Sequence, residues 1–146
     1  MIAILLVRHA DIALPRVSAD PSLNDAGRAR AEALAHVAGS AGVTTVFTSP
    51  FRRTKETAEP ILKRLGLVAR EMPDAATVAR QAHAGEYGPV VLIVGHSNTV
   101  PDVIAALGVA SPPAVHETRF DHLFVVSLTD AGQTGLLALT YGNPSF

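Results

Sequence analysis

The sequence predicts a three-layer α/β/α sandwich with a mostly parallel central sheet, and three observations support this fold class. First, residues 2–7 and 89–95 are apolar runs without polar alternation, which is typical of strands covered on both faces. Second, such strands alternate with segments of helical period, the order that builds a parallel sheet with crossover helices. Third, the apolar runs at 123–128 and 135–141 are joined by TDAGQT, which predicts an antiparallel hairpin at one edge.

Three further segments between these strands have the period of helices. They cover residues 24–39, 74–84 and 99–108. In the first, small and apolar residues recur at helical spacing and a glycine follows: Ala31, Leu34, Ala35, Ala38 and Gly39. Gly108 is the expected end of the last one. A short strand is expected over 67–71.

A Val/Thr-rich strand is expected at residues 43–49, and a helix follows it. We expect Ser49 to be the N-cap of this helix and Pro50 its first residue, because both types are favoured there. Gly66 is the expected C-terminal stop, since glycine adopts the left-handed conformation without strain. Pro60 lies inside the segment and predicts a kink.

Length and composition narrow the possible functions. The 146 residues fit one domain spanning 1–146, and 48% of them are apolar, enough for a sizeable core. The net charge of −1 argues against nucleic-acid or membrane-surface binding as the main activity. Without cysteine there is no disulfide or zinc–thiolate site. The first apolar run is too short to span a membrane and lacks signal-peptide features, so we expect a cytoplasmic protein.

Polar side chains follow three of the predicted strands, where ligands bind in such sheets. Arg8 and His9 follow the first strand, and Ser49, Arg52 and Arg53 follow the second. The strand at 89–95 is followed by a third group: His96, Ser97 and Asn98. Two arginines at a helix start are unfavourable for the helix dipole, which indicates an anionic ligand. We therefore expect one polar site at this rim.

The residue types in this group suit phosphoryl transfer. A histidine attacks phosphorus when its attacking nitrogen is neutral and its ring is held in one tautomer. Arginine matches the charge spread over the phosphoryl oxygens, because its planar fork donates paired hydrogen bonds. Arg8 with either Arg52 or Arg53 would form the clamp. His96, and the backbone near Asn98, would add further donors.

Four segments in this order resemble the histidine phosphatase superfamily, also called phosphoglycerate-mutase-like: LLVRHAD, LNDAGRARAEALA, FTSPFRRTKETAEPI and VLIVGHSNTVP. Together with the strands and helices that carry them, they span about residues 2 to 107. The resemblance implies that His9 is the nucleophile and that Arg8, Arg53 and His96 hold the phosphoryl group, with Arg53 selected over Arg52. Asn98 is a lesser phosphate-binding candidate. The resemblance implies no metal and no cofactor.

The sequence lacks the insertion that carries a glutamate proton donor in larger members of that superfamily. Several acids remain open for this role: Asp11, Glu71, Asp74, Glu117 and Asp121. A general acid contributes about 10²–10⁴-fold, so an enzyme without one would favour good leaving groups such as acyl phosphates or phosphohistidine. The short form resembles the compact branch that includes protein phosphohistidine phosphatases. We thus expect a phosphatase for a phosphorylated small molecule or a phosphoprotein, and we rank a mutase low because it needs a closed site.

Two other interpretations compete with this one. The GHSNT segment nearly fits a nucleophile elbow, with Ser97 attacking an ester and Asp121 and His122 completing a hydrolase triad. Adjacent residues of a strand point to opposite faces, which argues against that triad. The other interpretation is a phosphate-binding module that has the clamp but no turnover. The oligomeric state stays open.

Overall fold

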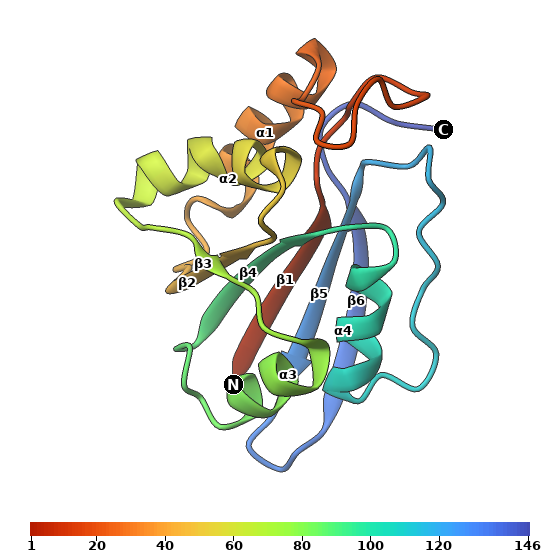
Figure 1. The fold of residues 1–146 in the computed structure, drawn as a ribbon. Coiled ribbons are helices and arrows are strands. Elements are labelled where there is room, and N and C mark those ends of the chain that lie inside the picture. Colours follow the sequence, from red (N-terminus) through yellow and green to blue (C-terminus); the bar gives the residue numbers. More distant parts are fainter.

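The computed structural model describes residues 1–146 and contains one six-stranded sheet of order β3-β2-β4-β1-β5-β6 (Figure 1). The strands are β1 (Ile2–Arg8), β2 (Thr45–Thr48), β3 (Arg70–Glu71), β4 (Val90–Gly95), β5 (His122–Leu128) and β6 (Thr134–Thr140). The strands β1, β2, β3 and β4 all run parallel to one another. The last two add an antiparallel hairpin beside β1. This topology confirms the predicted fold class.

Four helices form the two outer layers: α1 (Asp25–Ala38), α2 (Arg52–Leu65), α3 (Ala75–His83) and α4 (Thr99–Leu107). The helices α1 and α2 cover one face of the sheet, and α3 and α4 cover the other (Figure 1). In β1, Ile4 and Leu6 belong to the core under α3 and α4, and Leu5 and Val7 to the core under α1 and α2. Burial on both faces explains why β1 shows no polar alternation. No helix has the length and apolarity to cross a membrane.

The start of α1 packs directly against the chain that leaves β1. The side chain of Asn24 caps the helix by accepting a hydrogen bond from the Gly27 amide. The Asn24 amide donates to the carbonyl oxygen of Asp11 at 3.1 Å. A side chain at position 27 would overlap the same carbonyl group. This close approach therefore requires glycine at position 27. It fixes the start of α1 against Asp11, which lies two residues beyond His9.

The start of α2 differs from the prediction. The helix begins at Arg52, and its N-cap is Phe51, which makes no side-chain capping bond. Ser49 is not the cap, because its hydroxyl is bonded to Thr54 and His96 instead. The helix continues through Pro60. It ends as expected at Gly66, whose φ of 67° is left-handed and whose amide donates to the Leu62 carbonyl.

Candidate active site

The pairing of β1 with β4 brings two histidines together at the rim of the sheet. Arg8 lies opposite Gly95, and the His9 amide continues the ladder by donating to the Gly95 carbonyl at 2.8 Å. His96 follows immediately on β4. The rings of His9 and His96 are 5.4 Å apart, centre to centre, in an edge-to-face arrangement. Two segments far apart in sequence thus deliver one histidine pair.

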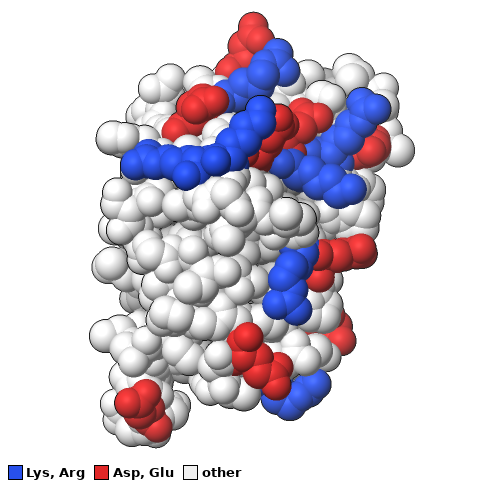
Figure 2. Space-filling view, turned by 90° about the vertical axis from the view of Figure 1, so that its left-hand side faces the viewer, with Lys and Arg blue, Asp and Glu red and all other residues white.

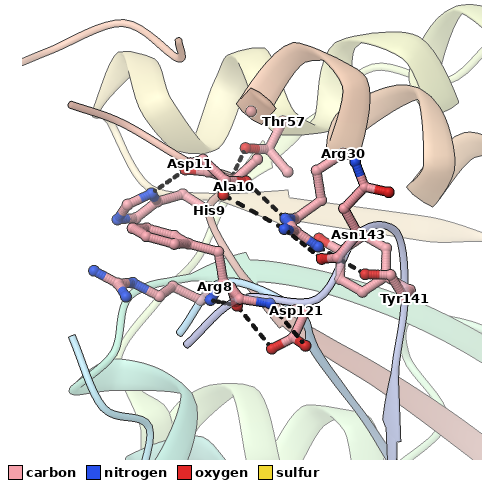
Figure 3. A network of polar contacts seen from close by, with 12 residues as sticks. Arg8, His9, Ala10, Asp11, Arg30, Thr57, Asp121, Tyr141 and Asn143 are labelled. Carbon is pink, nitrogen blue, oxygen red and sulfur yellow. Dashed lines mark hydrogen bonds and ion pairs between the residues drawn. The ribbon is translucent and has the colours of Figure 1, made fainter. Parts of the chain in front are cut away.

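The ring of His9 is held in a single tautomer by the backbone of the next residue. Its Nδ1 donates to the carbonyl oxygen of Ala10 at 2.8 Å. The Ala10 amide in turn donates to Thr57 Oγ1 at 2.8 Å (Figure 3). The Thr57 hydroxyl donates to the Arg53 carbonyl at 2.6 Å. Because a carbonyl can only accept, Nδ1 carries the hydrogen, and the neutral ring has its lone pair on Nε2.

His9 is also kept neutral. Its side chain is buried, and burial lowers its pKa from 6.5 to about 3. The hydrogen bond to Ala10 opposes this shift, whereas the positive charge of Arg8 adds to it. The pKa lies far below neutrality, so the imidazole is unprotonated at physiological pH. An unprotonated Nε2 is the form that can act as a nucleophile.

Arg8 is anchored by the loop before β5. Its Nη1 donates to the carbonyl oxygens of Glu117 at 2.6 Å and Arg119 at 2.9 Å, and its guanidinium lies 4.1 Å from the centre of the Phe120 ring. Burial lowers its pKa to about 10, so it stays positively charged at neutral pH. Its buried Nε has no hydrogen-bond partner in the protein. Arg8 is therefore oriented by carbonyls and keeps a donor for an anion.

Arg53 is buried on the first turn of α2, with only 6% of its surface exposed. Its guanidinium lies 4.5 Å from the centre of the Phe51 ring, and its buried Nη1 has no partner. Arg52, the alternative that spacing alone leaves open, is exposed and does not line the cavity at this rim. A buried guanidinium N–H without a protein partner is what an anion-binding site provides.

His96 is positioned by the hydroxyl groups of Ser49, which the sequence placed at this rim, and of Thr54, which sequence reasoning missed. Its Nε2 lies 2.8 Å from Ser49 Oγ, which lies 2.9 Å from Thr54 Oγ1. Thr54 is fully buried and donates to the carbonyl of Phe51 or Ser49. Burial, followed by the charge of Arg53, lowers the pKa of His96 to about 4. The SP element in the sequence is therefore part of the site rather than a helix cap.

These side chains line a cavity of about 420 Å³ at the carboxyl ends of β1, β2 and β4. Its walls contain the four residues predicted as catalytic together with the weaker candidates and residues that sequence reasoning missed: Arg8, His9, Arg53, His96, Ser97, Asn98, Thr99, Ile12, Leu14, Arg16, Phe51 and Glu117. Of the missed residues, Arg16 carried one signal. It lies on the loop that leaves the strand of His9, so it starts from the same rim.

Glu117 is the one acid, among those the sequence leaves open as proton donors, that lines the cavity. Its carbonyl oxygen accepts the 2.6 Å hydrogen bond from Arg8, so its backbone is tied to the Arg8 guanidinium. Its carboxylate forms no ion pair or hydrogen bond with the protein. The structure therefore brings one free carboxylate to the same cavity as His9.

The other acids lie elsewhere. Asp11 forms a buried ion pair with Arg30 at 2.6 Å. Asp121 accepts hydrogen bonds from Arg119 Nε at 3.0 Å and Ser145 Oγ at 2.9 Å. The remaining two are the N-cap of α3 and an exposed residue of β3, namely Asp74 and Glu71. These contacts give all four acids positions outside the cavity lining.

The geometry does not support a serine hydrolase. Ser97 lines the cavity, but its hydroxyl makes no hydrogen bond to a histidine. The ring of His122 stacks on Phe124 at 5.2 Å, and the neighbouring Asp121 is held by Ser145 and Arg119. No group of three or more histidine, aspartate or glutamate side chains is arranged to hold a metal ion.

Comparison with known proteins agrees with this fold. The chain is similar in structure to the protein histidine phosphatase SixA complexed with tungstate, with a TM-score of 0.78 and 23% identity over 95% of this chain and 97% of that one. A mycobacterial glucosyl-3-phosphoglycerate phosphatase bound to inorganic phosphate gives 0.70 and 18%, over 99% and 98%. An Escherichia coli putative α-ribazole-5′-phosphate phosphatase gives 0.75 and 15%, over 95% and 96%. No curated protein matches by sequence.

A family-level match covers half of the chain. Residues 4–76 match the family described as the histidine phosphatase superfamily, branch 1. This segment holds the first strand with Arg8 and His9, the close approach of α1, and the arginine of α2. The chain is a member of the histidine phosphatase superfamily.

Proposed function

We propose that this protein is a metal-independent phosphatase that acts through a phosphohistidine at His9. One observation carries the proposal. The Nδ1–H of His9 is bound to the Ala10 carbonyl, so the lone pair is on Nε2 of a ring that burial keeps neutral. Arg8 and Arg53, each with a buried donor that no protein group satisfies, line the same cavity. The reaction class is supported by the structural relatives. They are described as a protein histidine phosphatase and as phosphatases of phosphorylated small molecules.

The reaction has two displacement steps at phosphorus. In the first, the Nε2 lone pair of His9 forms a bond to phosphorus, and the bond between phosphorus and the leaving atom breaks with its electron pair. Arg8, Arg53 and His96 bind the equatorial oxygens, where negative charge develops. In the second, water attacks phosphorus and the P–N bond breaks. Its electron pair returns to Nε2, which restores the neutral ring and releases inorganic phosphate.

We further assign the leaving-group proton to Glu117. Its carboxyl would protonate the departing oxygen or nitrogen in the first step and, as carboxylate, accept a proton from water in the second. This assignment is supported by its place in the cavity wall and by its lack of any other partner. Arg8 holds its backbone, so the carboxyl is offered from a fixed loop rather than from a mobile one.

Substrates that differ only in leaving group test the role of Glu117. Glu117→Gln should lose about 10²–10³-fold in kcat/KM on an alkyl phosphate, which needs a proton. On p-nitrophenyl phosphate, whose leaving group departs as an anion, the loss should be within about threefold, because little general-acid assistance is needed there. Glu71→Gln is the matched control, since Glu71 is an exposed acid on β3 outside the cavity. Equal losses on both substrates would contradict the assignment and leave the phosphohistidine mechanism untouched.

The function itself is tested by turnover in the presence of EDTA. A panel of an aryl phosphate, an acyl phosphate and a phosphoramidate covers the three substrate types we propose, namely phosphomonoester, acyl phosphate and phosphohistidine. The wild-type protein should hydrolyse at least one of them, and His9→Gln should hydrolyse none. His36→Gln, on the exposed face of α1, is the control. Binding of phosphate without turnover on any member of the panel would instead support a phosphate-binding module.

A further inference from the structure

Arg16 is a third arginine in the wall of the cavity, and the proposed reaction does not use it. It lies on the loop between β1 and α1, is exposed, and forms no hydrogen bond or ion pair with the protein. The loop is held on both sides of it. Ile12 and Leu23 are buried, and Asp20 accepts a 2.8 Å hydrogen bond from the Arg52 amide. Arg16 is thus an unpaired cation on an anchored loop that borders the active site.

Arg16 and Glu117 line different parts of the cavity wall. Its charge acts on Arg53 and on His96, lowering the pKa of both. Glu117 acts instead on Arg8, whose Nη1 it binds through its carbonyl. Asp20, on the loop of Arg16, is bonded to the amide of Arg52 beside Arg53, so Arg16 lies toward Arg53 and Glu117 toward Arg8. The wall between them also includes apolar side chains.

Charge balance shows what Arg16 is suited to bind. Arg8 and Arg53 already supply two positive charges, which match one phosphoryl dianion. A further guanidinium near Arg53 is repelled by it unless an anion lies between or beside them. Asp20, on the same loop, is bonded to the backbone of Arg52. No protein carboxylate pairs with Arg16, so its guanidinium is free to bind an anionic group.

We propose that Arg16 binds a second anionic group of the substrate, close to the phosphoryl group that is transferred. The substrate is then a phosphorylated acid or a diphosphate rather than the phosphate of a neutral alcohol. Leu14 and Phe51, exposed by 46% and 41%, line the same cavity and would contact the atoms that join the two anions. The inference rests on the proposed function, because it takes the transferred phosphoryl group to lie between Arg8 and Arg53.

Binding of three phosphonates tests this proposal. They have no P–O ester bond, so a phosphatase cannot hydrolyse them during the measurement. Methylphosphonate has one anionic group, phosphonoacetate adds a carboxylate, and methylenediphosphonate adds a second phosphonate. Isothermal titration measures the Kd of each for the wild type, for Arg16→Gln and for Arg52→Gln. Arg52 is the matched control, because it is a neighbouring exposed arginine outside the cavity and its removal changes the net charge equally.

The wild type should bind at least one of the two-anion probes about tenfold more tightly than methylphosphonate, the gain expected of one charge-assisted contact. The probe that shows the gain identifies the second anion as carboxylate or phosphate. Arg16→Gln should abolish the gain and leave the Kd of methylphosphonate within about twofold, whereas Arg52→Gln should keep the gain.

Other outcomes overturn the proposal in distinguishable ways. If the wild type shows no gain, or if Arg16→Gln retains it, Arg16 does not bind a second anion, and the phosphatase proposal is unaffected. If Arg52→Gln loses the gain as completely as Arg16→Gln, the effect is one of overall charge and the Arg16 site is wrong. If none of the phosphonates binds the wild-type protein, the phosphate site itself is contradicted, and the inference about Arg16 falls with it.

Discussion

The Nδ1 atom of His9 lies 2.8 Å from the carbonyl oxygen of Ala10, the residue that follows it in the chain. This contact selects the tautomer whose lone pair is on Nε2, and it does so with a backbone group that cannot titrate. The amide N–H of Ala10 donates to Thr57 on α2. The chemical state of the proposed nucleophile is therefore supported by a helix that also carries Arg53, the arginine proposed to bind phosphate.

Thr57→Val should weaken this support, because it leaves the buried Ala10 amide without an acceptor. An unsatisfied buried amide costs about 1–3 kcal/mol in the free energy of unfolding, which urea denaturation measures. The kcat on an activated aryl phosphate should fall as well, since the Ala10 carbonyl is then free to turn away from His9. Thr57→Ser retains the hydroxyl and should keep most of both quantities. Wild-type kcat in Thr57→Val would show that the support is unnecessary.

Arg53→Lys should lower kcat/KM by about 10²–10³-fold, the loss typical for one donor aimed at developing charge. The substitution keeps the positive charge but removes the planar fork and the stacking on Phe51. Steady-state kinetics with the same aryl phosphate measures it. Arg52→Lys, one residue away and exposed, should change kcat/KM by less than about twofold. Similar losses in both variants would mean that the two arginines share the phosphate contact.

Arg30→Met should be among the most destabilising substitutions in the protein. Arg30 is 4% exposed, pairs with Asp11 at 2.6 Å, and donates to the carbonyls of Tyr141 at 2.7 Å and Asn143 at 2.8 Å (Figure 3). Removing one partner of such a buried pair costs about 3–5 kcal/mol. The matched change Arg28→Met removes a solvent-exposed pair on the same helix and should cost less than about 1 kcal/mol.

The same pair links stability to the site. Asp11 lies two residues beyond His9, and its carbonyl receives the Asn24 amide and contacts Gly27. If Arg30→Met and Arg28→Met have equal midpoints in chemical denaturation, the network in Figure 3 is not a determinant of stability.

Most other charged side chains lie on the surface, as Figure 2 shows for one face, and single ion pairs there contribute little to stability.

Stability should fall as the pH is lowered from 7 to 5, and His9 should contribute about 2 kcal/mol of that fall. The unfolded histidine has a pKa near 6.5, and burial lowers the folded value to about 3. Between these values the unfolded state binds more protons, so acid favours unfolding. His9→Gln should therefore show a smaller loss of unfolding free energy between pH 7 and pH 5 than the wild type. His36→Gln, exposed on α1, should retain the wild-type loss.

Equal losses in wild type and His9→Gln would place the acid sensitivity elsewhere. His96 is the alternative, because burial lowers its pKa to about 4 and the sign of its contribution is the same. A His96→Gln variant measured in parallel separates the two rings. Urea denaturation at each pH gives the unfolding free energies directly.

The sequence predicted those site residues that lie at the ends of strands. Arg8, His9 and His96 directly follow or end strands whose register is set by continuous apolar runs, so their meeting at the rim could be predicted. The choice of Arg53 came from a resemblance to known phosphatases, since spacing alone left Arg52 equally possible. The cavity lining includes only Arg53, because α2 turns the two arginines to different sides.

Contacts between distant loops could not be predicted in the same way. Glu117 reaches the cavity because Arg8 binds the carbonyls of its loop, and no local pattern signals that contact. Ser49 has the residue type of a helix cap, but its hydroxyl is used by His96 after folding. Arg16 lies in a Pro-containing loop without periodicity, where sequence patterns give no direction to a side chain.

The most direct test of the account is to trap the phosphorylated protein. Wild-type protein is mixed with an activated aryl phosphate, quenched in alkali within milliseconds, digested, and mapped by mass spectrometry. We expect one phosphate on the peptide that contains His9, stable in alkali and lost in acid, and no phosphate in His9→Gln. A phosphate that survives acid, lies on another residue, or persists in His9→Gln would contradict the central claim.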